Sequence, residues 1–523
     1  MTSTSLLHDN LIRRVNVGDM LLRAAERHPA KDMIVDGPRC FTYAAFNAWV
    51  NRVAHGLIAQ GFQPGDRLAL LSGNRAEFLV TYFACAKAGI ALVPINLLWG
   101  ESEIRYVQGH AKTKAVVVEQ ALLGKLKGAL DEGCNEMPLF VIDPEVGQAP
   151  SFDTLGEGHS EGEPEVCVPN EAAITILYTS GTTSAPKGVV GSHLAITMDS
   201  LGTALDTRMT DKDRVTALLP LFHTAQLNAL CTPAIAAGAS IVIFRGFDAA
   251  ALLDAIERER ISVAFALPMM IRLLCDEQAR RPRRLDSLRL TVYAMATMPR
   301  QDLLRAMELL GCEFSLMFGQ TEMSPVATFF RPEHQLSHEG AVGTPATNVR
   351  VAIMDDAGHL LTAGQSGEIV YRSAQVLSEY LDNPQATADV FRHGWFHSGD
   401  AGHFDGDGVL WFDDRFKDVI KSGGENVSSV EVEKAILETE PMLAEVAVIG
   451  LPHPHWTEAI TAVVKPGDGQ NLDTEGLLRR LREGLSPFKC PKAVIVVPEL
   501  PKTATGKIQK AQLRRTHADF YRS

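Results

Sequence analysis

Residues 172–188 read AAITILYTSGTTSAPKG, an apolar run followed by a loop that is rich in glycine and in hydroxyl side chains. The run Ala172–Thr179 predicts a buried strand. In the loop Ser180–Gly188, glycines let the backbone approach a ligand closely, hydroxyls and backbone N–H groups can bind phosphate oxygens, and Lys187 adds a positive charge. The loop is not a Walker motif, because Lys187 follows a proline and precedes a glycine. On these residues alone, a phosphate site and a flexible connection both stay open.

The residues around this stretch alternate between short apolar runs rich in Val and Ile and longer helical patterns. Buried strands separated by helices are typical of parallel or mixed sheets with helices on their faces, so we expect an α/β fold. Asp248 is an expected N-cap, and the acidic segment Gly156–Pro164 is an expected surface loop. The expected strands are Arg67–Ser72, Ile90–Asn96, Ser240–Phe244 and Ile261–Leu267, and the expected helices are Arg75–Gly89 and Ala249–Arg260.

The pattern changes in the last hundred or so residues, which predict a compact α+β domain of ordinary size. The aspartates of Asp405–Gly408 (DGDG) lack the further spaced ligands of a calcium loop, so this segment predicts a turn. The boundary is expected near Arg415–Asp418, which divides the chain into residues 1–416 and 417–523. The expected elements are helices at Ser429–Glu438 and Thr474–Gly484 and strands at Val446–Gly450 and Ile460–Lys465.

Length and composition limit the class of protein. A chain of 523 residues is too long for one hydrophobic core, so at least two domains are expected. A formal net charge of -13 argues against an electrostatic nucleic-acid binder. Eight cysteines stand singly, without an apolar leader or a membrane-spanning run, which predicts a cytoplasmic protein without integral membrane contact. Peripheral membrane contact stays open.

Five segments in this order resemble the adenylate-forming superfamily of acyl-CoA ligases, luciferases and peptide-synthetase adenylation domains. They are Tyr178–Val190 (YTSGTTSAPKGVV), Phe318–Glu322 (FGQTE), Trp395–Asp400 (WFHSGD), Asp414–Glu433 (DRFKDVIKSGGENVSSVEVE) and Pro501–Lys507 (PKTATGK). The similarity extends from about Phe41 to Lys510. It implies an ATP-dependent acid–CoA ligase that uses ATP, Mg²⁺ and coenzyme A. The acid first becomes an acyl-adenylate, and the acyl group then passes to coenzyme A.

The resemblance implies roles for residues of the first four segments. Glu322 and Thr179 would hold Mg²⁺, Thr321 would contact the adenylate phosphate, and Asp400 would accept hydrogen bonds from the ribose hydroxyls with help from Arg415. The residues implied to hold the β- and γ-phosphates are Thr179, Ser180, Gly181, Thr182, Thr183 and Lys187, and those beside the nucleotide are Phe318, Gly319 and Gln320. Taken singly, Glu322 would be a solvated loop acid, and Asp400 or Arg415 a surface ion-pair partner.

The resemblance also implies a small mobile C-terminal domain that carries the catalytic lysine, Lys507. This domain would rotate about Lys417 so that coenzyme A can reach the adenylate. Ser422, Gly423 and Gly424 would line the path of coenzyme A, with Glu425 and Lys421 nearby. Because no carrier domain follows, free coenzyme A is favoured over a carrier protein as acceptor. A luciferase-like oxygenase and a nucleotide-binding regulator without catalysis are less favoured functions.

The substrate is less constrained. His223 in Pro220–His223 (PLFH) resembles an acyl-pocket histidine, although an ordinary partly buried histidine fits equally well. The segment offers no aspartate to pair with an ammonium group, which disfavours amino acids. Met295 and Met323 are candidate pocket residues, and Ala294–Met298 (AMATM) replaces a Gly-Gly-Ala-Pro-like run of relatives. We expect a medium- or long-chain fatty acid, with an aryl or phenylpropenoid acid as the alternative.

Two further features are ambiguous in the sequence. The segment RRPRR (residues 280–284) could attract anionic lipid or the phosphates of coenzyme A, but a solvated helix end is favoured. Relatives of this superfamily occur as monomers and as homodimers, so the sequence predicts neither state.

Overall fold

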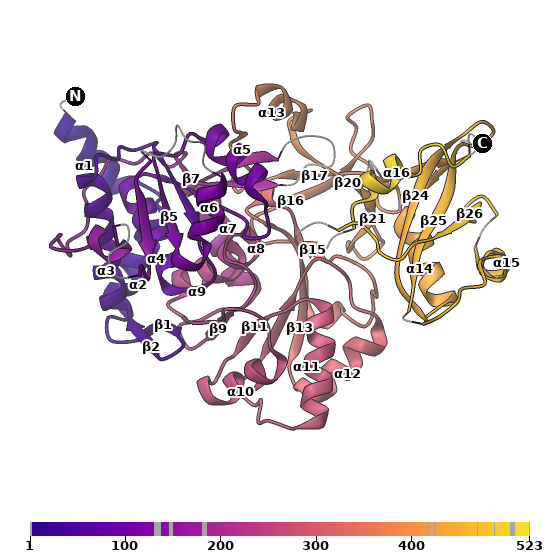
Figure 1. The fold of residues 1–523 in the computed structure, drawn as a ribbon, viewed down its shortest axis with the longest axis horizontal. Helices are drawn as coiled ribbons and strands as arrows, with labels where there is room; N and C mark the ends of the chain where they lie inside the picture. The colour runs from indigo at the N-terminus through magenta and orange to yellow at the C-terminus, as the bar shows by residue number, and fades with distance from the viewer. Residues whose placement is uncertain are drawn as a thin grey trace. The chain divides into compact units, whose positions relative to one another are not determined.

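The structure is a computed structural model that describes residues 3–129, 137–145, 150–179, 186–415, 418–422, 425–467, 469–485, 487–502 and 508–521. Ser180, Gly181, Thr182, Thr183, Lys417, Gly423, Gly424 and Lys507 lie outside the described residues. The chain divides into two compact units. Their helices and strands are labelled in Figure 1. The larger contains the chain up to Thr179, Pro186–Val351 and Tyr371–Phe396, and the smaller contains Ala352–Val370 and the chain from His397. The boundary at residues 416–417 stays a prediction.

The larger unit contains a nine-stranded sheet in the order β15-β14-β13-β12-β11-β9-β10-β1-β2. The six strands from β13 to β1 run parallel to one another, while β14 and β15 at one end of the sheet and β2 at the other pair in antiparallel register. The strands are β1 (Asp32–Asp36), β2 (Arg39–Thr42), β9 (Arg214–Ala217), β10 (Ser240–Ile243), β11 (Val263–Phe265), β12 (Leu290–Tyr293), β13 (Glu313–Gly319), β14 (Val326–Phe330) and β15 (Thr344–Pro345).

A second, seven-stranded sheet of this unit has the order β18-β8-β7-β4-β3-β5-β6. Here β7, β4, β3, β5 and β6 are parallel, and β8 and β18 add antiparallel strands at one edge. The strands are β3 (Arg67–Leu71), β4 (Ala91–Pro94), β5 (Ala115–Glu119), β6 (Leu139–Ile142), β7 (Ala173–Thr179), β8 (Lys187–Ser192) and β18 (Glu379–Tyr380). The expected α/β fold with mixed sheets is therefore confirmed.

Helices flank both sheets, and α4 (Ala76–Ala88) shows how they cover them. All of its residues are buried, including Glu77 and Lys87, so α4 lies inside the unit. The other α-helices are α1 (Ser3–Arg13), α2 (Val17–Arg27), α3 (Tyr43–Ala59), α5 (Glu101–Ala111), α6 (Leu123–Ala129), α7 (His193–Asp206), α8 (Thr224–Gln226), α9 (Thr232–Ala237), α10 (Ala249–Glu259), α11 (Pro268–Arg280), α12 (Arg300–Leu310) and α13 (Pro384–Val390).

The local signals act as predicted at the ends of two helices. Asp248 caps α10 by accepting a hydrogen bond from the backbone N–H of Ala251 at 2.7 Å. Gly89 ends α4 with φ of 72°, a left-handed conformation that glycine adopts without a steric cost. The predicted strands at 67–72, 90–96, 172–179, 240–244 and 261–267 all form, and β11 is shorter than expected.

In the smaller unit, β21 (Leu410–Arg415) pairs with β20 (Trp395–Phe404) in antiparallel register. They belong to a five-stranded sheet whose path is β16 (Arg350–Met354), β17 (Gly367–Arg372), β20 and β19 (Phe391–Arg392).

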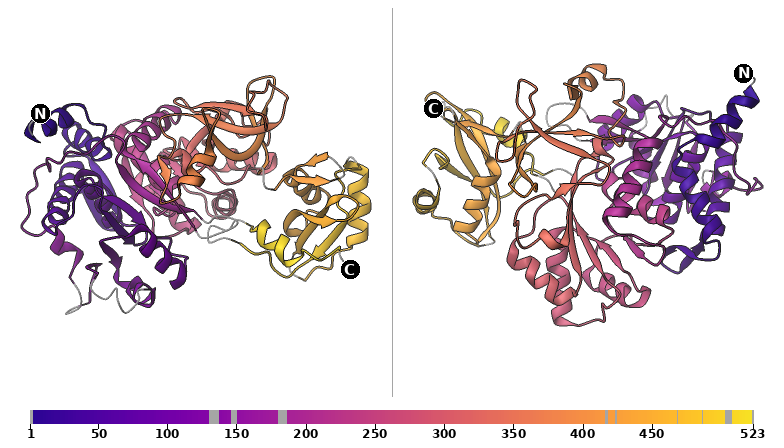
Figure 2. Two further views of the ribbon diagram at one scale, coloured as in Figure 1. Left: turned by 90° about the horizontal axis from the view of Figure 1, so that it is seen from above. Right: turned by 180° about the vertical axis from the view of Figure 1, so that it is seen from behind.

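The C-terminal residues form a further sheet in the order β23-β22-β25-β24, with β26 beside β25. Alternate residues of β24 face opposite sides: Val446 and Val448 pack on helices α14 and α15, and Ala447 and Ile449 pack on α16. Figure 2 shows the ribbon of this C-terminal part from two further sides. The smaller α+β domain is therefore confirmed. The elements are β22 (Ile420–Ser422), β23 (Glu425–Val427), β24 (Leu443–His453), β25 (Thr457–Pro466), β26 (Ala493–Val496), α14 (Ser429–Thr439), α15 (Thr474–Gly484) and α16 (Lys510–Thr516). Across the described parts of both units, no helix is long and apolar enough to cross a membrane.

Candidate functional site

The two ends of the predicted phosphate loop are neighbours in one hairpin. Thr179 is the last residue of β7 and pairs with Lys187, the first residue of the antiparallel strand β8. Both strands lie in the seven-stranded sheet, and residues 188–192 of β8 are buried. The fold thus fixes Thr179 and Lys187 opposite each other at the point where the loop leaves the sheet.

Glu322 lies on the turn η5 (Thr321–Met323), between β13 and β14. Its Oε1 accepts a hydrogen bond of 2.9 Å from the hydroxyl of Tyr380, and its backbone carbonyl accepts one of 2.7 Å from the N–H of Leu377. Phe318 and Gly319 end β13, and Gln320 and Thr321 follow directly. Among the described residues, no lysine or arginine forms an ion pair with Glu322.

Tyr380 connects Glu322 with Lys187. It pairs with Val189 of β8, and the Lys187 ammonium lies 4.7 Å from the centroid of its ring. Burial and the Glu322 carboxylate raise the pKa of Tyr380, so its hydroxyl stays a hydrogen-bond donor. One side chain therefore contacts the predicted phosphate-binding lysine and the predicted magnesium ligand. Sequence reasoning did not identify Tyr380 as a site residue, because it stands in none of the five matching segments.

The carboxylate of Glu322 fits a magnesium ion that shares its ligands with a nucleotide. Among the described residues, the carboxylate accepts a hydrogen bond from a neutral hydroxyl and pairs with no cation, so lone pairs stay available for a metal. In the described parts of the chain, no cluster of three or more His, Cys, Asp or Glu side chains could hold a metal alone. Mg²⁺ commonly takes one or two carboxylates from the protein and its other ligands from phosphate and water.

His223 is the N-cap of the short helix α8, which continues into a π-helical turn at Leu227–Cys231. Such turns are frequent at functional sites. The imidazole packs against Phe222, with 4.6 Å between the ring centroids. Burial lowers the pKa of His223 to about 4, so the ring is neutral at pH 7.

The two predicted pocket methionines differ in exposure. Met323 is fully buried, whereas Met295 exposes 65% of its surface and has φ of 76°. That backbone conformation favours glycine, the residue type that the resemblance places in this run. A role of either methionine in an acyl pocket stays a prediction.

In the smaller unit, Asp400 of β20 and Arg415 of β21 form a cross-strand pair. Arg415 Nε lies 3.7 Å from Asp400 Oδ1, and the Arg415 side chain is 44% exposed. The preceding segment is fixed by Glu368, which accepts hydrogen bonds from the backbone N–H of Gly399 at 3.0 Å and pairs with His397 at 2.7 Å. The two residues predicted to contact ribose are therefore adjacent. Ser422, predicted to line the coenzyme A path, is buried in β22.

The arginines of RRPRR all lie beside carboxylates of α10, α11 or the following segment. The ion pairs are Arg280–Glu277, Arg281–Asp254, Arg283–Asp254, Arg283–Glu277 and Arg284–Asp286. The four arginines share three carboxylates, so most of their positive charge is compensated locally, which favours the solvated helix end over an anion-binding surface.

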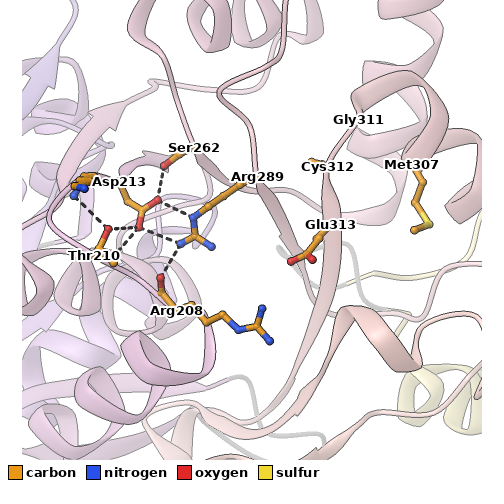
Figure 3. A pocket seen from close by; sticks show the side chains of 10 residues that line it. Arg208, Thr210, Asp213, Ser262, Arg289, Met307, Gly311, Cys312 and Glu313 are labelled. Atoms are coloured by element: carbon orange, nitrogen blue, oxygen red, sulfur yellow. Dashed lines mark hydrogen bonds and ion pairs between the residues drawn. The ribbon is translucent and has the colours of Figure 1, made fainter.

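An open pocket of about 850 Å³ lies elsewhere, at the beginnings of β9, β12 and β13, and contains none of the predicted site residues. Figure 3 shows Asp213 on one wall between Thr210, Ser262 and Arg289. The N–H groups of Arg289 donate hydrogen bonds to Asp213 and to two backbone carbonyls. The polar groups of this wall bind one another and connect neighbouring strands, so the wall does not indicate a ligand site.

The chain matches known proteins over nearly its full length. Residues 21–381 match the description "AMP-binding enzyme" and residues 431–507 match "AMP-binding enzyme C-terminal domain". The chain is 34% identical to a feruloyl-CoA synthase from Amycolatopsis sp, covering 96% of this chain and 99% of that protein. It is 32% identical to a long-chain-fatty-acid–CoA ligase from Mycobacterium tuberculosis, covering 96% and 99%. The crystal structure of ATP-bound MatB from Rhodopseudomonas palustris superposes with a TM-score of 0.87 at 29% identity, covering 97% of this chain and 100% of that one.

Proposed function

Because the chain belongs to the family of AMP-binding enzymes and is an ATP-dependent acid–CoA ligase, we propose that it activates an apolar monocarboxylic acid, namely a medium- or long-chain fatty acid. The observation that carries the ATP-dependent chemistry is the cluster in which Tyr380 contacts both Lys187 and Glu322. The Lys187 ammonium, which can bind phosphate, and the Glu322 carboxylate, which can bind a metal, therefore lie beside the same side chain.

The reaction has two steps. In the first, a carboxylate oxygen of the acid attacks the α-phosphorus of ATP, and the bond to pyrophosphate breaks. In the second, the sulfur of coenzyme A attacks the acyl carbon, AMP leaves with the oxygen that came from the acid, and the thiol proton is released. The first step supplies the leaving group that a carboxylate lacks.

Positioning and electrostatics carry the first step. Lys187 offsets the charge of the β- and γ-phosphates, and the hydroxyl of Tyr380 orients the Glu322 carboxylate. A magnesium ion bound by Glu322, with Thr179 as a further ligand, would neutralise phosphate charge. Thr321, together with Phe318, Gly319 and Gln320, contacts the adenylate.

The remaining nucleotide and acceptor contacts are assigned to the smaller unit. Asp400 accepts hydrogen bonds from the ribose hydroxyls and Arg415 supports it. Lys507 places an ammonium group against the developing charge during adenylation. Rotation about Lys417 then opens a path for coenzyme A past the residues Ser422, Gly423 and Gly424.

The acyl side favours an uncharged substrate body. The neutral ring of His223, its contact with Phe222 and the buried Met323 offer no fixed charge to an incoming acid. A fatty acid fits such a lining, and one relative is named a long-chain-fatty-acid–CoA ligase. A second candidate is an aryl or phenylpropenoid acid, because another relative is named a feruloyl-CoA synthase.

Pyrophosphate release with ATP and Mg²⁺ tests the proposal, run on matched fatty, aryl and amino acids with and without coenzyme A. We expect release with fatty acids of about eight carbons or more, accompanied by acyl-CoA. Release confined to aryl acids would replace the first candidate by the second. Pyrophosphate and a trapped adenylate without any thioester would point to a carrier protein as the acceptor, and release with amino acids alone would contradict the proposed substrate class.

A further inference from the structure

Asp199 is a carboxyl group in the interior of the larger unit. It lies on α7, and only 1% of its surface is exposed. Its Oδ1 accepts a hydrogen bond of 3.1 Å from the backbone N–H of Val326 and lies 3.4 Å from Nε2 of Gln375. The two N–H groups of Gln375 also donate to two backbone carbonyls, so the contact with Asp199 is a weaker, shared hydrogen bond. No basic side chain of the described chain forms an ion pair with it. An uncompensated charge in this position would be costly.

Two buried side-chain oxygens at this position lack a hydrogen-bond partner among the described residues. Within the part of the chain that the structure describes, neither Asp199 Oδ2 nor Gln375 Oε1 has a hydrogen-bond donor. The amide oxygen of Gln375 can only accept a hydrogen bond, and so can Oδ2 of an ionised Asp199. Protonation of Asp199 turns its Oδ2 into a hydrogen-bond donor. Burial raises the pKa of Asp199 well above its usual range, which agrees with a neutral group.

Gln375 connects Asp199 to the turn that carries Glu322. Its side chain is fully buried, and its Nε2 donates to the backbone carbonyls of Met323 at 2.9 Å and of Val326 at 2.5 Å. Those two carbonyls lie just after Glu322 and at the start of β14. The amide of Gln375 therefore fixes the backbone where the chain passes from the Thr321–Met323 turn into β14.

The segment that contains Gln375 contacts the turn at two more points. The N–H of Leu377 donates to the carbonyl of Glu322, and the hydroxyl of Tyr380 donates to its carboxylate. The backbone and side chain of Glu322 are thus both set by this segment. Among the described residues, Asp199 forms no hydrogen bond with Glu322 or Tyr380, so Gln375 stands between it and the turn.

We propose that Asp199 is a positioning residue that is kept neutral and acts through Gln375 to fix the Thr321–Met323 turn in the position in which Glu322 meets magnesium-bound ATP. This inference rests on the proposed function. Residues that orient a metal ligand commonly change metal affinity by about 10–100-fold when they are replaced. The neutral state distinguishes Asp199 from Asp206, which lies later on the same helix and ion pairs with Arg331 at 2.8 Å.

Calorimetric titration of the full chain with ATP, with and without Mg²⁺, tests the proposal, and thermal unfolding of each variant is recorded beside it. Asp199→Asn keeps the shape and the neutral charge, so its magnesium-dependent ATP affinity should stay within about twofold of the parent protein. Asp199→Ala and Gln375→Met should each weaken that affinity about tenfold while binding of ATP alone changes little. Gln375→Met keeps the side-chain volume, which provides a test if Asp199→Ala does not fold.

Asp206→Asn is the matched control, because it should lower the unfolding temperature and leave the magnesium dependence unchanged. An Asp199→Asn protein that loses affinity as severely as Asp199→Ala would show that the carboxylate charge is used, and would overturn the proposal. Unchanged affinity in Gln375→Met would overturn it as well. These titrations need no acid substrate, so failure of the proposed function would appear separately, as absent turnover by the parent protein.

Discussion

The turn that carries Glu322 and the strand pair that carries Asp400 hold their carboxylates in opposite ways. Glu322 is bonded by a neutral hydroxyl, from Tyr380, whereas Asp400 lies beside the guanidinium of Arg415. A carboxylate with only neutral partners keeps its charge available for a cation. One beside a guanidinium is already compensated and serves better as a hydrogen-bond acceptor for hydroxyls. The difference supports the proposed roles, in which Glu322 binds the metal and Asp400 binds the ribose.

Glu322→Gln should have the largest effect on activity, because it removes the carboxylate that is proposed to bind the metal. The amide keeps an oxygen for the Tyr380 hydroxyl but removes the charge for the metal. We expect acid-dependent pyrophosphate release to fall by about 10²–10³-fold, with loss of the normal dependence on Mg²⁺ concentration. Steady-state rates over a magnesium series measure both effects. A variant with the parent's rate and magnesium curve would remove Glu322 from the metal site.

Glu77 is a third kind of carboxylate, because it accepts hydrogen bonds from two guanidinium groups. Burial opposes its ionisation, but hydrogen bonds from Arg39 and Arg75 outweigh it and lower the pKa of Glu77 to about 2. Because the folded pKa is depressed from 4.5, its contribution to stability is complete above pH 4.5 and is lost as the pH falls toward 2. We expect a loss of about 3 kcal/mol over that interval in chemical denaturation. Glu77→Gln should flatten this part of the pH profile, and an unchanged slope would contradict the assignment.

Asp400→Asn tests the other side of the comparison. The charge-assisted hydrogen bonds to ribose should weaken by about 2 kcal/mol, which raises the KM for ATP by about 30-fold. The magnesium dependence should stay that of the parent protein, because this residue is assigned to the ribose. Kinetics with 2′-deoxy-ATP check the assignment: the variant should discriminate less between the two nucleotides. Parallel losses in ATP affinity and magnesium affinity would contradict it.

Tyr380→Phe should have a smaller effect. The variant keeps the ring beneath Lys187 and removes only the hydrogen bond to Glu322. A loss of about 1 kcal/mol corresponds to a roughly fivefold weaker activation by Mg²⁺. Tyr380→Leu, which also removes the ring, serves as the partner variant and should cost more. Equal rates in all three proteins would show that Tyr380 orients neither residue.

Met295→Gly should produce the smallest change. A methionine at φ of 76° carries backbone strain that glycine would relieve, by about 1 kcal/mol. Glycine also increases the entropy of the unfolded chain, which offsets part of this gain. We therefore expect a change in thermal midpoint of a few degrees at most, upward. Destabilisation by several degrees would mean that the exposed side chain makes contacts that matter to the fold.

The elements around the phosphate loop could be predicted because their signals are local. The run Ala172–Thr179 forms β7, and Asp248 caps α10, since hydrophobic periodicity and capping depend on a few adjacent residues. The five motifs likewise identified the superfamily, and Glu322 and Lys187 do lie around one side chain.

Contacts between distant residues could not be predicted in this way. Glu163 belongs to the segment expected to be only a surface loop, yet it ion pairs at 2.6 Å with the buried Lys87. Gln375 and Asp199 are 176 residues apart and stand in no motif, so nothing local indicates their hydrogen bond. Only the arrangement of the sheets brings such residues together.

Transfer of ¹⁸O from a labelled acid tests the central claim, an acyl-adenylate intermediate, most directly. The enzyme would be supplied with ATP, Mg²⁺, coenzyme A and an acid labelled in both carboxylate oxygens, and the products would be analysed by mass spectrometry. The account predicts one ¹⁸O atom in AMP for each acyl-CoA formed, and none in pyrophosphate. Label in inorganic phosphate with release of ADP would instead show attack on the γ-phosphorus and would contradict it.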